Sequence, residues 1–256
     1  MNRIKTAFSK GKAFIPFFTC GDPDLETTEQ LVLAAAEAGA DLIELGIPFS
    51  DPTAEGPVIQ GANMRALAGG VTTDLIFGLV RRLREQTQVP LVFMTYANVV
   101  FSYGTERFLT QAAQAGVDGL ILPDVPFEEK EEFAAPCREH GLVLISMVAP
   151  TSEGRVAQIA REAEGFLYCV SSMGVTGVRS QITTDVGAMV ALAKQANPNV
   201  PCAIGFGIST PEQAAAMGAK ADGVIVGSAI VKLVGQHGRQ AVGPVREFVR
   251  QMKQAL

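Results

Sequence analysis

Short apolar runs recur along the chain, and each is followed by a longer stretch whose apolar residues have helical spacing. This alternation constrains the fold more than any other feature, because strands that alternate with helices favour a parallel sheet covered by helices. We predict eight strands, one in each apolar run. They lie near Ala13–Thr19, Asp41–Gly46, Leu91–Met94, Gly119–Leu122, Leu142–Met147, Gly165–Val170, Cys202–Gly205 and Gly223–Val226.

Eight strand-then-helix units in a chain of 256 residues match an α/β fold of the (β/α)8 TIM-barrel type with extra helices. Leu25–Ala38 and Val242–Leu256 are two of the predicted helices. The alternative is an open doubly wound sheet, which usually has fewer strands and a nucleotide-binding turn. With 48% hydrophobic residues the chain can bury one large core but is short for two. We therefore expect residues 1–256 to form a single barrel domain.

Two connections between predicted strands are longer than the others. They are Ile47–Gly70 after the second strand and Ser171–Asp185 after the sixth. Long loops in compact domains are usually functional, and barrel chemistry takes place at the carboxyl-terminal ends of the strands. We expect both loops to overhang the active site, with the Gly-, Ser- and Thr-rich second loop acting as a lid.

Net charge and cysteine spacing exclude some classes of function and indicate the cellular compartment. The net charge of −5 argues against non-specific binding to nucleic acid or to an anionic membrane. We see no apolar leader at the start and no run near the ~18 apolar residues of a spanning helix. The four cysteines are widely spaced without a CxxC pair, which is typical of free thiols in a reducing compartment. We expect a cytoplasmic protein.

Two carboxylates stand at the end of the second predicted strand and in the loop after it. Glu44 lies among Leu42, Ile43 and Leu45, where few local partners are available and desolvation should raise its pKa toward the range of a general acid or base. Glu55 follows in the loop, before Gly-Pro. The alternatives are a structural ion pair for Glu44 and a solvated loop acid for Glu55.

Glycines follow the last two predicted strands, where barrels often bind phosphate. Gly207 lies after the seventh strand, and Ser209 with Glu212 forms a helix-capping pattern. Gly227 and Ser228 open a helix after the eighth strand. Free backbone N–H groups and the helix dipole can hold an anion there, although such glycines can also serve only to make turns.

The sequence lacks the residues that a metal site, a serine or cysteine nucleophile with its base, or a Schiff-base lysine would need. His140 and His237 have no ligand spacing with an acid or thiol, so we expect no metal site. Neither histidine ends a strand, which leaves a serine or cysteine nucleophile without an obvious base. No lysine ends a strand either, and this disfavours a Schiff-base aldolase.

The chain resembles the tryptophan synthase alpha subunit family along essentially its whole length and in the family's order. The matching stretches are 14–23 (FIPFFTCGDP), 44–60 (ELGIPFSDPTAEGPVIQ), 95–98 (TYAN), 118–126 (DGLILPDVP), 174–177 (GVTG), 205–209 (GFGIS) and 222–230 (DGVIVGSAI). The resemblance implies a (β/α)8 barrel that cleaves indole-3-glycerol phosphate by a retro-aldol reaction to indole and D-glyceraldehyde 3-phosphate, in L-tryptophan biosynthesis.

The resemblance also assigns roles to the two acids. Glu44 matches the glutamate that moves protons at indole C3 and at the leaving side chain. Glu55 matches the acid that engages the indole N–H, but the family's residue there is aspartate. Glutamate keeps the carboxylate and reaches one methylene further, so we expect the same chemistry with an altered rate.

Further residues match family positions around the substrate. Tyr168 matches a tyrosine beside the catalytic glutamate, and Thr176 matches the lid that closes over the substrate. The remaining matches are Phe17, Tyr96, Ile121 and Phe206 in the indole pocket, and Gly177, Gly207, Gly227 and Ser228 around the phosphate.

The resemblance implies a partner as well. Pro48 and Asp51 match the loop that faces the beta subunit, a pyridoxal-phosphate enzyme that joins indole to serine within an alpha-beta-beta-alpha heterotetramer. The alpha chain itself is expected to carry no cofactor.

Three alternative functions stay open on sequence grounds. A stand-alone indole-3-glycerol phosphate lyase would release free indole rapidly without a partner. A non-catalytic regulatory barrel subunit predicts loss of the carboxylates or the phosphate glycines, and both are present. An isomerase of another sugar phosphate is compatible with the fold alone.

Overall fold

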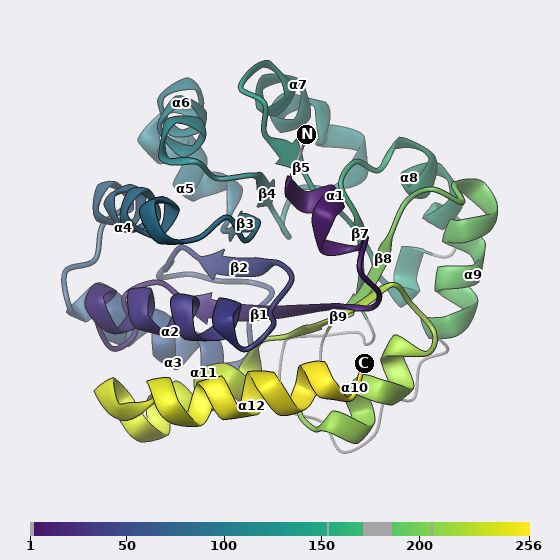
Figure 1. The fold of residues 1–256 in the computed structure, drawn as a ribbon. Coiled ribbons are helices and arrows are strands. Elements are labelled where there is room, and N and C mark those ends of the chain that lie inside the picture. The colour runs from purple at the N-terminus through teal and green to yellow at the C-terminus, as the bar shows by residue number, and fades with distance from the viewer. Residues whose placement is uncertain (1–2, 153, 171–185, 206) are drawn as a thin grey trace.

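The computed structural model describes residues 3–152, 154–170, 186–205 and 207–256 (Figure 1). Within these ranges all strands belong to one parallel sheet, whose order is β5-β4-β3-β2-β1-β9-β8-β7-β6. The two end strands, β5 and β6, are consecutive in sequence, so the sheet curls round into a nearly closed barrel. This ring excludes the open doubly wound alternative. The strands are β1 Ala13–Thr19, β2 Ile43–Gly46, β3 Leu91–Met94, β4 Gly119–Ile121, β5 Val143–Leu144, β6 Ser146–Val148, β7 Leu167–Val170, β8 Cys202–Gly205 and β9 Gly223–Val226.

The fifth predicted strand, Leu142–Met147, is split into two in the structure. Its first half, β5, pairs with β4, and its second half, β6, pairs with β7. Ile145 lies between them and donates its backbone N–H to the Leu120 carbonyl at 2.9 Å. The apolar run looks continuous in sequence, whereas the split depends on which neighbour each half pairs with.

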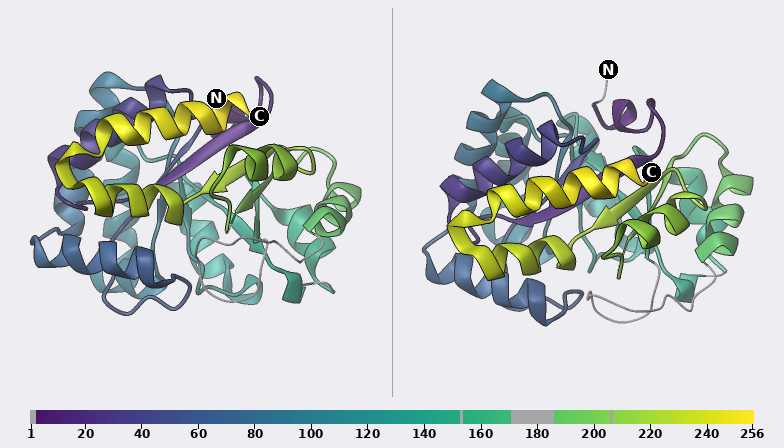
Figure 2. Two further views of the ribbon diagram at one scale, coloured as in Figure 1. Left: turned by 90° about the horizontal axis from the view of Figure 1, so that it is seen from below. Right: turned by 60° about the horizontal axis from the view of Figure 1, so that its bottom comes forward.

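Helices cover the outside of the sheet, and the last one, α12, lies alongside α2 and α11 (Figure 2). The α-helices are α1 Arg3–Ala7, α2 Leu25–Glu37, α3 Pro57–Ala68, α4 Thr73–Gln86, α5 Ala97–Tyr103, α6 Thr105–Ala115, α7 Glu131–Glu139, α8 Val156–Glu162, α9 Val186–Ala196, α10 Pro211–Gly218, α11 Ser228–His237 and α12 Val242–Gln254. Three 3-10 turns are η1 Phe127–Glu129, η2 Pro150–Ser152 and η3 Gly238–Gln240. No helix in the described ranges combines the length and apolar character needed to cross a membrane.

The long connection after β2 is only partly a loop, which corrects the prediction for Ile47–Gly70. An irregular segment runs as far as Gly56, and α3 then begins at Pro57. Proline suits the first helical position because its missing N–H has no partner there anyway. The second long connection, 171–185, lies outside the described residues.

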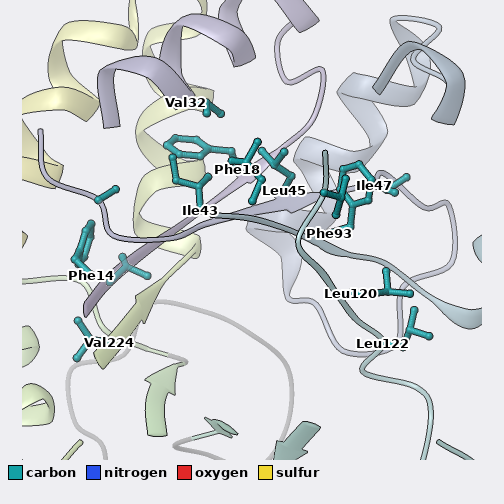
Figure 3. Close-up of a cluster of buried hydrophobic side chains, with 14 of the residues drawn as sticks. Phe14, Phe18, Val32, Ile43, Leu45, Ile47, Phe93, Leu120, Leu122 and Val224 are labelled. Carbon is teal, nitrogen blue, oxygen red and sulfur yellow. The ribbon is translucent and has the colours of Figure 1, made fainter. Parts of the chain in front are cut away.

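Side chains on the two faces of the strands form two separate apolar clusters. One set, including Phe14, Phe18 and Ile43, packs outward against helices such as α2, which contributes Val32 (Figure 3). The alternate set, including Phe17, fills the barrel interior. Every residue of β1 is buried, as expected for strands covered on both faces.

Three aspartates stand just before strands, at the amino-terminal face of the barrel. Asp41 precedes β2, Asp118 precedes β4 and Asp222 precedes β9. Each accepts a backbone N–H from the start of the neighbouring strand and pairs with a cation from a helix. The donors are, in order, Phe14 and Lys253, Leu91 and Arg84, and Cys202 and Lys194. These carboxylates tie helices to strand starts in three places around the ring.

Candidate active site

Glu44 points into the barrel from β2, next to Phe17 of β1 in the register of the sheet. Its side chain is only 1% exposed. Neither of its carboxylate oxygens has a hydrogen-bond partner within the described part of the chain. Burial alone raises the pKa of Glu44 to about 8, because desolvation disfavours the charged form. At neutral pH this carboxyl therefore carries a proton that it can give away.

Glu55 reaches the same interior from the irregular segment before α3. It is 6% exposed, and its Oε2 accepts a hydrogen bond from Asn63 Nδ2 at 3.4 Å. Burial raises the pKa of Glu55 to about 7, and hydrogen bonds from Tyr96 and Asn63 act in the opposite direction. Glu55 therefore changes its charge close to neutral pH, at a lower pH than Glu44.

A small cavity joins the two acids at the carboxyl-terminal end of the barrel. The residues that line it are Phe17, Glu44, Glu55, Ile59, Met94, Tyr168, Gly207, Ile208, Ile225, Gly227 and Ser228. Two glycines make room for its aromatic walls. A Cβ at Gly46 would lie 2.4 Å from the Phe17 ring, and one at Gly205 would lie 2.5 Å from the Tyr168 hydroxyl.

Glycine-rich backbone and a helix start also line the cavity. Gly207 follows β8 with φ +83°, a conformation that favours glycine. Gly227 is the N-cap of α11, Ser228 is its first residue, and no side chain caps this end. The N–H groups of the first helical turn have no partner within a helix, so this end can bind an anion such as phosphate.

The preceding helix, α10, starts slightly differently from the predicted capping pattern. Thr210, not Ser209, is its N-cap and accepts a hydrogen bond from the Gln213 N–H at 3.3 Å. Ser209 instead donates its hydroxyl to the Gln213 side chain at 3.1 Å. Either residue type can cap, and the backbone path after Gly207 decides which one stands at the helix end.

One cavity is thus lined by two protonatable acids and by a helix start that can bind an anion. Such a site suits acid–base chemistry on a phosphorylated substrate with an apolar part. The family model described as "Tryptophan synthase alpha chain" matches residues 4–256. This chain belongs to the tryptophan synthase alpha chain family.

Individual relatives agree with the family model. The tryptophan synthase alpha chain of Lacticaseibacillus casei is 48% identical over all of this chain and 96% of its own length. That of Shouchella clausii is 52% identical over 91% of this chain and 87% of its own. A crystal structure of the tryptophan synthase alpha chain from Legionella pneumophila superposes with a TM-score of 0.88 at 36% identity, covering 100% of this chain and 97% of that one.

The geometry brings together most of the site residues predicted from the family resemblance. Phe17, Glu44, Glu55, Tyr168, Gly207, Gly227 and Ser228 share the cavity. The Tyr96 hydroxyl makes a hydrogen bond with the Glu55 carboxylate. The same hydroxyl accepts the Ala54 N–H at 3.0 Å. Ile121 is fully buried in the interior cluster. Thr176, Gly177 and Phe206 lie outside the described residues.

The two residues predicted to face a partner differ in exposure. Pro48 is buried within the chain, whereas Asp51 is exposed. Asp51 accepts a hydrogen bond from the neighbouring Ser50 hydroxyl. In the irregular segment after β2, Phe49 packs its ring 5.3 Å from that of Tyr96. The segment that carries Asp51 therefore contacts Tyr96, which in turn contacts Glu55.

Sequence reasoning missed Asn63 and the apolar lining residues Ile59, Met94 and Ile225. Asn63 lies on the buried stripe of α3, where its companions are Ile59, Ala62 and Ala66. A polar residue on an otherwise apolar helical stripe was a usable signal. The prediction of a loop over Ile47–Gly70 hides this signal, because a loop has no buried face.

The described residues also bear on metal binding and on thiol reactivity. In the ranges that the structure describes, no three His, Cys, Asp or Glu side chains are grouped as a metal site requires. All four cysteines are free and buried. Burial raises the pKa of the Cys20 thiol far above its ordinary value, which keeps it protonated and unreactive.

A larger cavity lies beside the one that holds the two acids. It measures about 350 Å³, against about 30 Å³ for the smaller cavity. Ala54, Met147 and Val170 are among its lining residues, as are Leu122 and Phe127. Ala54 precedes Glu55, and Leu144, Ile145 and Ser146 also line this space. It therefore lies next to the segment that carries Glu55, at the place where the fifth predicted strand is split.

Proposed function

We propose that this chain cleaves indole-3-glycerol phosphate to indole and D-glyceraldehyde 3-phosphate, with Glu44 and Glu55 as the catalytic acids. The observation that carries the proposal is the shared cavity in a member of the tryptophan synthase alpha chain family. In it, an unpaired buried carboxyl faces a second acid and a helix start that suits phosphate.

The protonated form of Glu44 starts the reaction. Its proton goes to indole C3, and the ring nitrogen takes the positive charge as an iminium. The resulting Glu44 carboxylate then removes the proton from the hydroxyl on the adjacent side-chain carbon. As that oxygen forms the aldehyde, the carbon–carbon bond breaks, and its electron pair returns to the ring and neutralises the iminium. Glu44 ends the cycle protonated, as it began.

Glu55 acts at the other side of the ring, in its ionised form. Its carboxylate accepts a hydrogen bond from the indole N–H and stabilises the positive charge that develops there. A charge that exists only during the reaction favours the transition state over the bound substrate. The low dielectric of the buried cavity strengthens this effect.

The phosphate and the ring occupy different parts of the site. Gly207, Gly227 and Ser228 hold the phosphate through backbone N–H groups and the dipole of α11. A bicyclic ring needs more room than the smaller cavity of about 30 Å³ offers. We therefore place the far edge of the ring toward the larger cavity, against Met147.

The product indole passes to a partner in this proposal. We infer a beta subunit that carries pyridoxal phosphate, in a cytoplasmic alpha-beta-beta-alpha heterotetramer, with residues 1–256 of this chain as one barrel domain. A similar solved structure is described as a tryptophan synthase complex from Pyrococcus furiosus. It is 35% identical, with a TM-score of 0.87 over 95% of this chain and 99% of that one.

Indole release from indole-3-glycerol phosphate tests the function directly. The isolated chain should release indole slowly, and addition of a beta subunit should accelerate it. A fast isolated chain that several beta subunits leave unchanged would favour the stand-alone lyase. A folded chain that releases no indole with or without the partner would contradict catalysis altogether.

A further inference from the structure

Glu55 is held in place by two side chains that no sequence pattern had connected with it. Asn63 lies near the middle of α3 and donates its amide to Glu55 Oε2 at 3.4 Å. Tyr96, just before α5, makes the second side-chain hydrogen bond. These two donors come from different elements, so they hold the carboxylate from two directions.

Tyr96 is itself fixed, and this defines which way its hydroxyl points. The hydroxyl oxygen accepts the Ala54 N–H at 3.0 Å, so its own hydrogen is free to be donated to Glu55. The start of α5 is capped by Asp124, whose two carboxylate oxygens accept the Ala97 N–H at 3.1 Å. Tyr96 is therefore held at the capped start of α5, next to the segment that carries Ala54 and Glu55.

The hydrogen bond to Glu55 explains why a buried position of α3 carries the polar residue Asn63. It is 4% exposed on a helical stripe whose other buried members are Ile59, Ala62 and Ala66. Burial of an amide among apolar groups costs free energy unless it finds a hydrogen-bond partner. An apolar residue would pack there at no such cost if the position served packing alone.

We propose that Asn63 is a positioning residue, which sets how far the longer acid at position 55 reaches into the site. This inference rests on the proposed role of Glu55 at the indole nitrogen. Glu55 is one methylene longer than the aspartate that the family resemblance predicts at this position. The amide on α3 anchors the extra length of Glu55, so that its carboxylate is held against the helix instead of swinging across the cavity.

The same contact also affects the charge of Glu55. An N–H donor stabilises a carboxylate more than a carboxylic acid, and the Asn63 hydrogen bond acts to lower the pKa of Glu55 against the effect of burial. Asn63 thus contributes both to the direction of the carboxylate and to the fraction of it that is ionised near neutral pH.

Replacement of Asn63 by leucine, which has a similar size, removes the amide and with it the hydrogen bond to Glu55. For Asn63→Leu we expect kcat to fall about tenfold with KM little changed, because a hydrogen bond to a charged group contributes about 1.5 kcal/mol. Carbon-13 NMR of the labelled carboxyl groups should show the pKa of Glu55 rising. Met64→Leu, on the exposed side of the same helix, is the matched control. An unchanged pKa of Glu55 would overturn the proposal.

A second variant covers the case in which Asn63→Leu does not fold. Asn63→Asp keeps the shape but replaces the donor with an acceptor that can carry like charge. The pKa of Glu55 should then rise further than in the leucine variant. A pKa of Glu55 equal to that of the wild type would contradict the contact.

A length-exchange experiment separates positioning from mere structural support. Glu55→Asp shortens the acid by one methylene, and Asn63→Gln lengthens the amide by one. If the two side chains act as a pair, the double variant should be at least fivefold more active than the product of the single effects predicts. Strictly additive effects would refute the pairing.

The NMR titration keeps this inference separate from the function. A wild-type chain that releases no indole contradicts the proposed function, whereas the pKa of Glu55 in the Asn63 variants reports on the contact itself. Indole release that is normal in the wild type and insensitive to all three Asn63 substitutions would contradict the positioning role alone.

Discussion

Carboxylates stand at both ends of the barrel, and their surroundings differ sharply. At the amino-terminal face, Asp118 accepts the Leu91 N–H and pairs with Arg84 at 2.6 Å and Arg3 at 2.8 Å. At the carboxyl-terminal end, Glu44 is buried more deeply and has no hydrogen-bond partner among the described residues. Both carboxyl groups are buried, but only one is given cations and N–H donors.

The difference separates stability from reactivity. Cations and N–H groups satisfy the oxygens of a buried carboxylate, which then ties elements of the fold together. Without them, burial favours the protonated form, which can deliver a proton near neutral pH. A buried acid without a partner costs folding free energy, and this is a feature expected of a functional site rather than of a structural one.

The largest expected effect comes from removing the proton of Glu44. Glu44→Gln should lower kcat by about 10³-fold, within the range usual for a general acid or base. Circular dichroism should show the same fold, since glutamine keeps the shape of the side chain. Retention of full activity by Glu44→Gln would refute the mechanism. A loss of activity caused by unfolding would mean that Glu44, like Asp118, serves the stability of the fold.

Asp118 should show the opposite behaviour, in stability instead of rate. Asp118→Ala leaves Arg84, whose side chain is 11% exposed, without its partner, and should lower the free energy of unfolding by about 3 kcal/mol. The kcat of the folded variant should not change. Urea unfolding measures the loss, with Glu247→Ala as a control because its pair with Arg250 is exposed. Equal losses in both variants would contradict the structural role.

The stability of the wild type should fall with pH on account of Glu44. Its pKa is about 8 in the folded chain against 4.5 ordinarily, so between these values the folded state binds more protons than the unfolded state. Stability is then lost as the pH rises through this window, by roughly 2 kcal/mol between pH 6 and 8. Denaturant unfolding of wild type and Glu44→Gln at both pH values measures this difference. A parallel pH dependence of the two proteins would contradict it.

The smallest effect concerns the rate as a function of pH. The active form needs Glu55 ionised and Glu44 protonated, so kcat/KM should rise through about pH 7 and fall through about pH 8. The rate at pH 6 should be several-fold below the maximum. Steady-state kinetics from pH 5.5 to 9.5 would check it, with Asp118→Asn expected to keep the same profile. A rate that rises steadily to pH 9.5 would contradict a protonated Glu44.

Much of the fold could be read from local pattern. The strands Ala13–Thr19, Leu91–Met94, Cys202–Gly205 and Gly223–Val226 have the predicted bounds, because each is a short apolar run ended by turn residues. The split at Ile145 and the start of α3 at Pro57 were not foreseen. Strand pairing and helix docking involve residues far apart in sequence, and no local pattern reports them.

The site divides in a similar way. The sequence by itself determined that Glu44 ends a buried strand, that glycines follow the last strands, and that the chain resembles one family throughout. Only the tertiary structure decided which carboxylates have partners, since Asp118 meets Arg84 and Glu55 meets Asn63 and Tyr96 through folding. The physical reason is that desolvation and hydrogen bonding depend on every element around a group, whereas a sequence pattern shows only its neighbours along the chain.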